Sequence, residues 1–281
     1  MVPVSICSFS FHRLLAAGKQ DVFRYITDCK ELGCAELDPW NAHLANLKSG
    51  DQVLQAGHNP DQSHKLLSAG DEEYIQKVKA AAEKAGLPFG TIAVDGAHIY
   101  EADAAARKAN RARAYRWLDV AHKLAARQVR IDAGGPENMP DDVFKIIKEG
   151  YRDILDRAKP LGIQVLFENH WGPTVIPDNC IKLVESIPGL GMLLDSNNFK
   201  PELRADGRKR CARYATATHI KTFAWDAQGN ETEADIPTAI KHLLDAGYKG
   251  VWGIESCPKD GDEYGGVRKT IALINRLVPA S

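Results

Sequence analysis

The fold of this chain is decided by the stretch Val165-Leu-Phe-Glu-Asn-His-Trp-Gly172. Its first residues form a continuous apolar run, which ends abruptly in polar side chains. Such a run, bounded by a turn, is typical of a strand buried on both faces of a parallel sheet. Ligands bind at the carboxyl ends of the strands in open and closed α/β sheets, so we expect Glu168 and His170 to face a binding site.

Three later segments repeat this design, an apolar run that carries an acidic residue or a histidine. They are Met192-Leu-Leu-Asp195, Ala217-Thr-His-Ile-Lys221 and Val251-Trp-Gly-Ile-Glu255. Each follows the previous one at about the length of one strand–helix unit. If each strand lies beside the last in a closed barrel, four side chains converge on one rim. These are Glu168, Asp195, His219 and Glu255.

The rest of the chain keeps the same rhythm of strand, helix and glycine. We expect strands at residues 3–11, 34–37, 88–94, 128–132, 163–167, 192–195, 217–221 and 250–255, with helices between them and after the last. Eight strands that alternate with eight helices, without a composition break that would mark a linker, predict one α/β domain, residues 1–281, with the (β/α)8 or TIM-barrel fold. A doubly wound sheet usually has a glycine-rich phosphate turn after its first strand, and Ser8-Phe-Ser-Phe-His12 is not one.

A long polar segment follows the second expected strand. It runs from Trp40 to Gly70 and contains His43, His58 and His64. Connections of this length are uncommon in compact domains, so we expect a partly ordered loop or lid before the helix that begins near Asp71.

Length, charge and cysteine content exclude several classes of protein. The chain has 281 residues, 44% of them hydrophobic, which is enough to bury a full core. The net charge is -1 with both signs interspersed, so we expect no nucleic-acid or membrane partner. No apolar run approaches the roughly 18 residues of a membrane helix. Six cysteines without C-x-x-C spacing and no visible signal peptide favour a cytoplasmic location, although a trimmed precursor would have the same N-terminus.

The four converging residues offer carboxylate oxygens and one imidazole, and no thiolate. This set of donors suits one divalent ion, for which we expect Mn²⁺ first and Mg²⁺, Co²⁺ or Zn²⁺ as alternatives. Taken singly, each residue could be an ordinary hydrogen-bonded strand terminus. Four of them at successive strand ends favour a metal site.

Several motifs resemble the sugar isomerase/epimerase superfamily with the xylose-isomerase-like barrel. They are Glu168-Asn-His170, Leu194-Asp195 with Asn198, His219-Ile-Lys221, Gly247-Tyr-Lys-Gly-Val-Trp-Gly-Ile-Glu255, Ser8-Phe-Ser-Phe-His-Arg13 and Gly33-Cys-Ala-Glu-Leu37. The resemblance implies a mononuclear metal held by the four converging residues, and isomerisation or epimerisation next to a carbonyl of a small sugar or keto-sugar. Members differ in function, so fold and metal transfer better than substrate does. Lid loops in this superfamily often meet across dimers, which makes a homodimer compatible with the resemblance.

The chemistry can also be argued from the residues themselves. A cation that binds a carbonyl and the adjacent hydroxyl acidifies the α-proton, because it stabilises the enediolate as charge develops. Removal and return of the proton need a base on each side of the carbon. Glu168 and Glu255 lie on opposite flanks of the expected metal, so we expect them to be ligands and general acid–base groups together. Asp195 and His219 would be ligands only.

Lys221 is the first of six candidate substrate-binding residues. It lies two residues past His219, so it points to the same side of the strand and could donate to a sugar hydroxyl. The alternative is a structural ion pair with Glu36 or Asp132, since buried lysines are rare without a partner.

The other candidates follow the ends of other expected strands. His170 stands to Glu168 as Lys221 does to His219, and either supports the metal ligand or touches the sugar. Trp171 could cover an apolar sugar face, or pack its loop against the barrel. The set is completed by Asn198, His98 and Glu36.

Three rival functions use the same fold or site. A lyase of the inosose-dehydratase or 3-keto-glycoside type shares the proton abstraction and then loses a β-leaving group. An endonuclease-IV-like nuclease needs three zinc ions and further histidines, but Asn198 stands where one of these is expected and Thr222–Gln228 lacks the required Asp-x-His pair. The absence of a basic surface also disfavours it. A sugar-binding barrel without catalysis would not require four convergent ligands.

Overall fold

A parallel sheet forms the centre of the computed structural model, which describes residues 2–45 and 72–279. Its seven strands follow the order β1-β7-β6-β5-β4-β3-β2, so the first and last strands of the chain are neighbours. The strands are β1 (Val4–Ile6), β2 (Thr91–Val94), β3 (Gln128–Ile131), β4 (Gln164–Glu168), β5 (Gly191–Asp195), β6 (Ala215–Thr222) and β7 (Trp252–Ser256).

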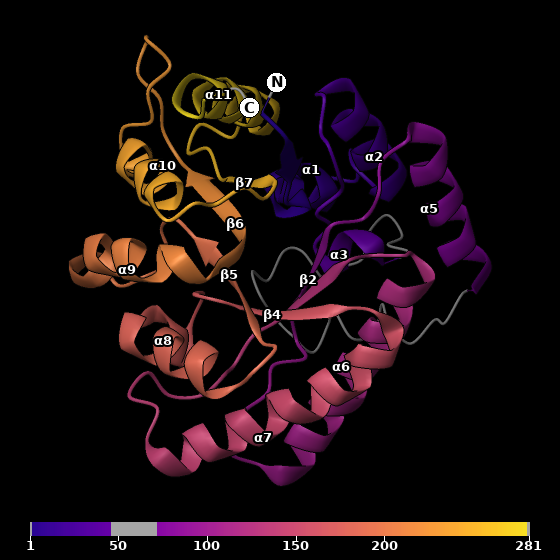
Figure 1. Ribbon diagram of the computed structural model, residues 1–281. Helices are drawn as coiled ribbons and strands as arrows, with labels where there is room; N and C mark the ends of the chain where they lie inside the picture. The colour runs from indigo at the N-terminus through magenta and orange to yellow at the C-terminus, as the bar shows by residue number, and fades with distance from the viewer. Residues whose placement is uncertain (1, 46–71, 280–281) are drawn as a thin grey trace.

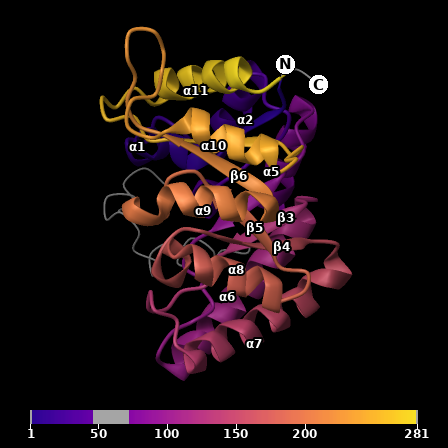
Figure 2. The ribbon, with the colours of Figure 1, turned by 60° about the vertical axis from the view of Figure 1, so that its left-hand side comes forward.

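The longer helices surround this sheet on its outer side, and the short α3 lies next to β2 (Figure 1). They are α1 (His12–Ala16), α2 (Val22–Glu31), α3 (Asn41–Leu44), α5 (Glu72–Ala85), α6 (Ala104–Lys123), α7 (Asp141–Ala158), α8 (Pro177–Ser186), α9 (Arg204–Cys211), α10 (Ile236–Asp245) and α11 (Glu263–Leu277). Figure 2 shows α8, α9 and α10 stacked in order along the outside of the sheet. Strands buried on both faces explain the apolar runs of the sequence: Val165, Leu166 and Phe167 of β4 are fully buried.

Residues 37–40 complete the ring between β1 and β2. They make isolated parallel bridges, which join Leu37 to Phe89, Asp38 to Cys7 and Trp40 to Ala93. The strand predicted at residues 34–37 is reduced to such bridges: Leu37 N–H donates to Pro88 O and its carbonyl accepts from Gly90 N–H, both at 2.8 Å. The pairing does not continue regularly, since the N–H of Asp38 donates to the Tyr25 hydroxyl at 2.8 Å and Pro39 has no N–H to give to a ladder. The predicted TIM-barrel fold is confirmed, with one of its eight positions held by bridges instead of a regular strand.

The first strand is also shorter than the sequence predicts. Residues 8–11 form a 3-10 turn, η1 (Ser8–Phe11), and α1 follows directly. Alternating serine and phenylalanine resemble a strand, but these serine hydroxyls bond to the backbone of neighbouring segments. Ser8 Oγ accepts from Trp40 N–H at 2.9 Å, and Ser10 Oγ accepts from Ser256 N–H at 3.0 Å. These bonds join η1 to segments far away in the chain, and the turn itself is closed by Ser10 N–H, which donates to Cys7 O at 2.9 Å.

Aspartate caps set where several helices begin. Asp103 Oδ2 accepts from Ala106 N–H at 2.7 Å, so α6 starts at Ala104. Asp235 caps α10, which begins at Ile236. After α9, the 3-10 turn η6 (Ala212–Tyr214) leads directly into β6, which begins at Ala215.

The predicted lid falls mostly on residues that the structure does not describe. Residues 46–71, with His58 and His64, lie outside the described ranges, whereas His43 is buried in α3. In the described ranges, no helix combines the length and apolar composition that crossing a membrane requires.

Candidate metal centre

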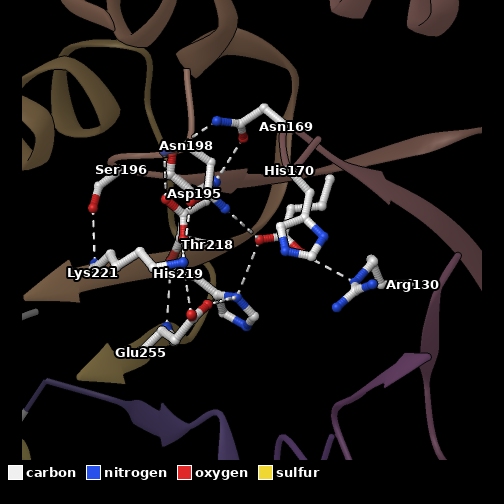
Figure 3. Close-up of polar contacts among 12 residues, drawn as sticks. Arg130, Asn169, His170, Asp195, Ser196, Asn198, Thr218, His219, Lys221 and Glu255 are labelled. Atoms are coloured by element: carbon white, nitrogen blue, oxygen red, sulfur yellow. Dashed lines mark hydrogen bonds and ion pairs between the residues drawn. The ribbon is translucent and has the colours of Figure 1, made fainter. Parts of the chain in front are cut away.

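The four residues predicted to bind metal lie together where neighbouring strands end. Glu168 ends β4 and Asp195 ends β5, while His219 and Glu255 lie in β6 and β7. Strand register makes this possible, because Asp195 pairs directly with His219 across the sheet. All four side chains are buried, and one potential ligand atom from each lies within 4.8 Å of the others. Figure 3 shows Asp195, His219 and Glu255 turned toward one another.

Two atoms of this group have unused bonding capacity. Asp195 Oδ2 and His219 Nδ1 are buried and have no hydrogen-bond partner among the described residues. His219 Nδ1 lies 3.2 Å from Glu255 Oε2 and 3.6 Å from Glu168 Oε1. Buried polar atoms are costly unless they are paired. Three carboxylates and an imidazole nitrogen aimed at one point therefore fit a divalent cation of the Mn²⁺, Mg²⁺, Co²⁺ or Zn²⁺ type.

A thiol is also near this point. Cys7 has a ligand atom within 4.8 Å of those of His219 and Glu255. Burial raises the pKa of the Cys7 thiol well above its usual range, which leaves it protonated. Since only the thiolate is a good metal ligand, the carboxylates and imidazole are the better donors.

Asp38 orients the imidazole of His219. The Nε2–H of His219 donates to Asp38 Oδ2 at 3.2 Å, which leaves Nδ1 to face the common point. Burial opposes the charge of His219, but the acidic groups around it, Asp38 among them, outweigh burial and raise its pKa well above the usual range, so a metal at Nδ1 would displace the proton that this nitrogen otherwise carries. Sequence reasoning missed this acceptor. Its signal was an acidic residue in the Asp38-Pro39 pair at the end of the second expected strand, a position like those of the four ligands.

Asn169 holds the end of β5 in place. Its side chain accepts from Asp195 N–H at 2.8 Å and donates to Asp195 O at 2.9 Å. Asp195 Oδ1 accepts from the N–H groups of Asn197 and Asn198, so only Oδ2 is turned to the common point. Burial raises the pKa of Asp195 to about 6; Lys221 opposes this rise, and the nearby Glu255 carboxylate adds to it.

Lys221 forms an ion pair, but not with either partner named from the sequence. Its Nζ lies 2.7 Å from Glu255 Oε1 and donates to Asn198 Oδ1 at 3.1 Å; Asp195 Oδ2 is 3.8 Å away. The main partner of Lys221 is therefore Glu255, and not Glu36 or Asp132 as expected from the sequence. Burial opposes the charge of Glu255, but Lys221 and His219 outweigh it and hold the pKa of this carboxyl well below its usual range.

Arg130 on β3 plays the same part for Glu168. Its guanidinium lies 2.8 Å from Asp95, 2.9 Å from Asp132 and, through Nε, 3.0 Å from Glu168 Oε2. Burial would raise the pKa of Glu168, but Arg130 reverses the effect and lowers it. Sequence reasoning missed this residue too, although an arginine inside an apolar strand signals a buried ion pair.

Replacing Arg130 by methionine is expected to destabilise the fold strongly, because the buried carboxylates of Asp132 and Glu168 and the partly buried Asp95 lose their shared cation. Breaking a buried ion pair from one side costs about 3–5 kcal/mol. Arg157→Met is the matched control, since Arg157 makes a half-exposed pair with Asp119 at 3.0 Å, and such pairs contribute less than about 1 kcal/mol. Urea unfolding measures the loss of unfolding free energy in each variant. Equal losses in Arg130→Met and Arg157→Met would contradict the prediction that Arg130 stabilises the fold more than a surface arginine does.

A small cavity of about 50 Å³, open on one side, adjoins the four residues. Phe9 and Trp40 form an aromatic wall, with their rings edge to face at 5.2 Å. Charged residues line the rest, among them Arg130, Lys221 and His170. Two of the six predicted substrate-binding residues, Lys221 and His170, therefore line the cavity.

His170 is held by Asp132 behind the cavity. Its Nδ1–H donates to Asp132 Oδ2 at 3.0 Å. Burial lowers the pKa of His170, but Asp132 and Glu168 outweigh it and raise it to about 9. The imidazole that faces the cavity is therefore protonated at neutral pH.

Three predicted substrate-binding residues lie around the cavity without lining it. Asn198 donates to Glu168 Oε1 at 3.2 Å and accepts from Lys221, so it connects two residues of the site. Trp171 donates from Nε1 to Asp132 at 3.0 Å, and its ring meets that of His98 edge to face at 5.1 Å. His98 in turn pairs with Glu101.

Glu36 is not brought to the site. Its carboxylate pairs with Arg127 and lies against Gly90, and these two residues precede β3 and β2. It therefore lies toward the amino-terminal ends of the strands, whereas the cavity is at their carboxyl ends.

Solved structures with the same fold are numerous, although their sequences differ. The IOLI protein, solved with a binding zinc atom, matches 99% of this chain and 100% of its own at a TM-score of 0.74 and 11% identity. D-allulose 3-epimerase from Methylomonas sp. matches 99% and 98% at a TM-score of 0.71 and 13% identity. The probable 3-DHS dehydratase AsbF from Bacillus anthracis matches 97% and 98% at a TM-score of 0.68 and 14% identity. At these identities the likeness establishes the fold.

Sequence comparison gives the family. No curated protein sequence matches the chain. A family model described as Xylose isomerase-like TIM barrel matches residues 52–277. The match does not test whether one domain extends over residues 1–281, which stays a prediction. It does cover the four carboxyl-end residues and confirms the resemblance seen in the motifs: the chain belongs to the xylose isomerase-like TIM barrel family.

Proposed function

We propose that this chain is a divalent-metal-dependent isomerase or epimerase of sugars or keto-sugars, which works by abstraction of the proton next to a carbonyl. One observation carries the proposal. Two buried carboxylates, Glu168 and Glu255, lie around one point together with His219 Nδ1 and Asp195 Oδ2, and the described residues give neither of these last two atoms a hydrogen-bond partner; a small cavity of about 50 Å³ adjoins them. Support also comes from solved relatives in fold that are named as D-allulose, L-ribulose and 3-keto-D-glucoside epimerases.

Glu168, Asp195, His219 and Glu255 would hold the ion. When bound, a divalent ion supplies a Lewis acid that stabilises negative charge on the substrate oxygens as the α-proton leaves. Mn²⁺ remains the ion we expect first, and the zinc of the IOLI structure makes Zn²⁺ its main competitor.

Proton transfer is assigned to the two glutamates. Each has its own cation, since Arg130 lies against Glu168 and Lys221 against Glu255. These pairs keep both carboxylates ionised, so that either can accept a proton, and fix their orientation toward the cavity. One glutamate would remove the α-proton, and the opposite glutamate, after taking a proton from solvent, would deliver that proton to the other face of the same carbon, which gives epimerisation. Return to the adjacent carbon gives isomerisation.

The aromatic wall orients the substrate. Phe9 and Trp40 line the cavity together with the charged residues. An aromatic face covers the C–H face of a sugar and excludes water from it. The substrate hydroxyls then face Lys221, His170 and the carboxylates.

Dehydration of a keto-sugar is the second candidate function, and His170 is the observation that favours it. A lyase needs an acid to protonate the leaving hydroxyl, and His170 faces the cavity with its pKa raised to about 9 against the opposing effect of burial. The fold relative named as a probable 3-DHS dehydratase agrees with such chemistry. The two functions share the first proton abstraction and differ in the product.

Incubation of the Mn²⁺-loaded protein with ketoses and keto-glycosides in D₂O tests the proposal. We expect one deuterium to enter at the carbon next to the carbonyl, together with an epimer or an aldose, visible by proton NMR. An unsaturated or dehydrated product would identify the lyase instead. Absence of deuterium from every sugar of the panel, with metal bound, would refute proton abstraction as the function.

A further inference from the structure

A second group of side chains suited to a metal ion lies beside the candidate metal centre. Asp95, Asp132 and His170 each place one potential ligand atom within 4.8 Å of those of the other two, and we call them the second cluster. They follow β2, β3 and β4, which are neighbours in the sheet, so its topology brings them together at the carboxyl ends of the strands. Two carboxylates and an imidazole are donors that divalent cations of the first transition row accept.

Arg130 fills the place of a cation in this cluster. Its Nη1 lies 2.8 Å from Asp95 Oδ1 and 2.9 Å from Asp132 Oδ2. Burial opposes the charge of Arg130, but the carboxylates around it outweigh burial and raise its pKa well above the usual range. An arginine in a folded protein does not lose its proton, so it cannot make room for a metal ion by becoming neutral. The guanidinium therefore excludes an ion from this point both by its volume and by its charge.

Glu168 connects the second cluster to the candidate metal centre. Its Oε1 lies 3.6 Å from His219 Nδ1, whereas its Oε2 lies 3.0 Å from Arg130 Nε. Catalytic sites with two metal ions hold them about 3.5–4 Å apart, a distance that one carboxylate can bridge with its two oxygens. Glu168 has this bridging arrangement, with the candidate metal centre on one side and a guanidinium on the other.

Asp132 retains unused bonding capacity in the cluster. This residue is 4% exposed, and its Oδ2 accepts from Arg130, His170 and Trp171. Its Oδ1 is also buried but has no hydrogen-bond partner among the described residues. A buried carboxylate oxygen without a partner is costly. A metal ion can take up such an oxygen, because it accepts ligands from several directions, whereas a planar guanidinium donates only in its own plane.

We propose that Arg130 takes the place of a second metal ion and thereby limits the catalytic site to one. Loss of the guanidinium should then turn the second cluster, together with the bridging Glu168, into a site for a divalent cation. The inference rests on the proposed function only in assuming one divalent ion at the four converging residues.

Metal content tests the proposal without any substrate. The parent chain and Arg130→Ala are loaded with Mn²⁺, dialysed and analysed for metal; we expect about one ion per parent chain and about two per variant chain. Arg157→Ala is the matched control, because Arg157 makes a half-exposed pair with Asp119 and its loss should leave the ion count of the parent unchanged. At low temperature, EPR distinguishes two Mn²⁺ ions coupled through a shared carboxylate from isolated Mn²⁺ ions.

Two further variants test the ligands and guard against misfolding. Adding Asp132→Asn to Arg130→Ala removes a carboxylate of the second cluster and should return the ion count to that of the parent. Arg130→Gln is shorter and uncharged but retains a polar side chain, and it should also gain an ion. Mn²⁺ should raise the Tm of both single variants more than that of the parent, since each additional ion that binds only the folded state stabilises it further.

Each result has a distinct meaning. An ion count equal to the parent's in both Arg130→Ala and Arg130→Gln overturns the role of Arg130 and leaves the proposed function standing. A second ion in the parent overturns it as well, because Arg130 would then exclude nothing. No ion in the parent but one in Arg130→Ala supports the role of Arg130 and refutes the metal site of the proposed function. If neither single variant folds even with Mn²⁺, a divalent ion cannot replace the guanidinium, and the inference falls.

Discussion

Replacing Glu255 by glutamine is expected to lower the rate of α-proton exchange by about 10³-fold, within the range that one general acid–base group contributes. Glutamine retains an oxygen that can face the metal, but its amide cannot take up a proton. It also faces Lys221 Nζ, which lies 2.7 Å from the Glu255 carboxylate. Metal affinity should therefore fall only in part while exchange is lost. Exchange of the substrate α-proton in D₂O, measured at saturating Mn²⁺, separates the two effects.

Glu233→Gln is the matched control for this variant. Glu233 is a glutamate of the loop that precedes α10, where it pairs with Lys259 on the surface. The same chemical change at that position should leave exchange and metal content as in the parent chain. A Glu255→Gln protein that exchanges as fast as the control would remove Glu255 from the list of bases and leave it as a ligand at most.

The four converging residues could be predicted because their positions follow from topology alone. In a barrel of parallel strands, residues at the carboxyl ends meet whatever the details of packing. In the structure, the strand register pairs Asp195 with His219 and Lys221 with Glu255. The prediction that these side chains meet did not depend on side-chain contacts. The structure brings the four residues together. Their roles as ligands and bases, the identity of the metal and the homodimer stay predictions.

The ion-pair partners could not be predicted, because they depend on how the ring closes. Asp38 reaches His219, 181 residues away in the chain, only because residues 37–40 fill the gap between β1 and β2. Arg130 meets Glu168 across neighbouring strands, and both side chains had to turn inward. Sequence alternation cannot decide this when a strand is buried on both faces.

Glu36 shows the same limit from the other side. An acidic residue on the second expected strand resembles the family pattern, but its height in the barrel decides its role. Glu36 lies beside Gly90 and Arg127, before the adjoining strands begin, and so pairs far from the cavity. A shift of one or two residues in strand register decides whether an acidic side chain reaches the site or forms a structural ion pair. The pattern of residue types in the sequence does not fix the register that closely.

Asp195→Asn is expected to remove the metal. The parent chain should retain about one divalent ion after loading and dialysis, and the variant should lose at least tenfold in affinity, since Asp195 supplies the buried and unpartnered Oδ2. The change retains an oxygen that accepts from the backbone N–H of Asn197, and the hydrogen bonds between the Asn169 side chain and the backbone of residue 195 are not affected. Asp206→Asn on the exposed face of α9 is the control. Elemental analysis of the three proteins decides, and close to three zinc ions per parent chain would revive the nuclease.

Thermal unfolding gives a second readout that does not depend on activity. A ligand that binds only the folded state stabilises it by about 2.7 kcal/mol at a hundredfold excess over its Kd, so Mn²⁺ should raise the Tm of the parent chain and of Asp206→Asn, but not that of Asp195→Asn. Without metal, Asp195→Asn should no longer have the lower Tm of the two proteins. Burial raises the pKa of Asp195 to about 6, so its ionisation opposes folding as the pH rises from the unfolded value near 4 through 6. At pH 8 the metal-free Asp195→Asn protein should therefore be at least as stable as the metal-free parent. A less stable variant would mean that Asp195 serves the fold and not the ion.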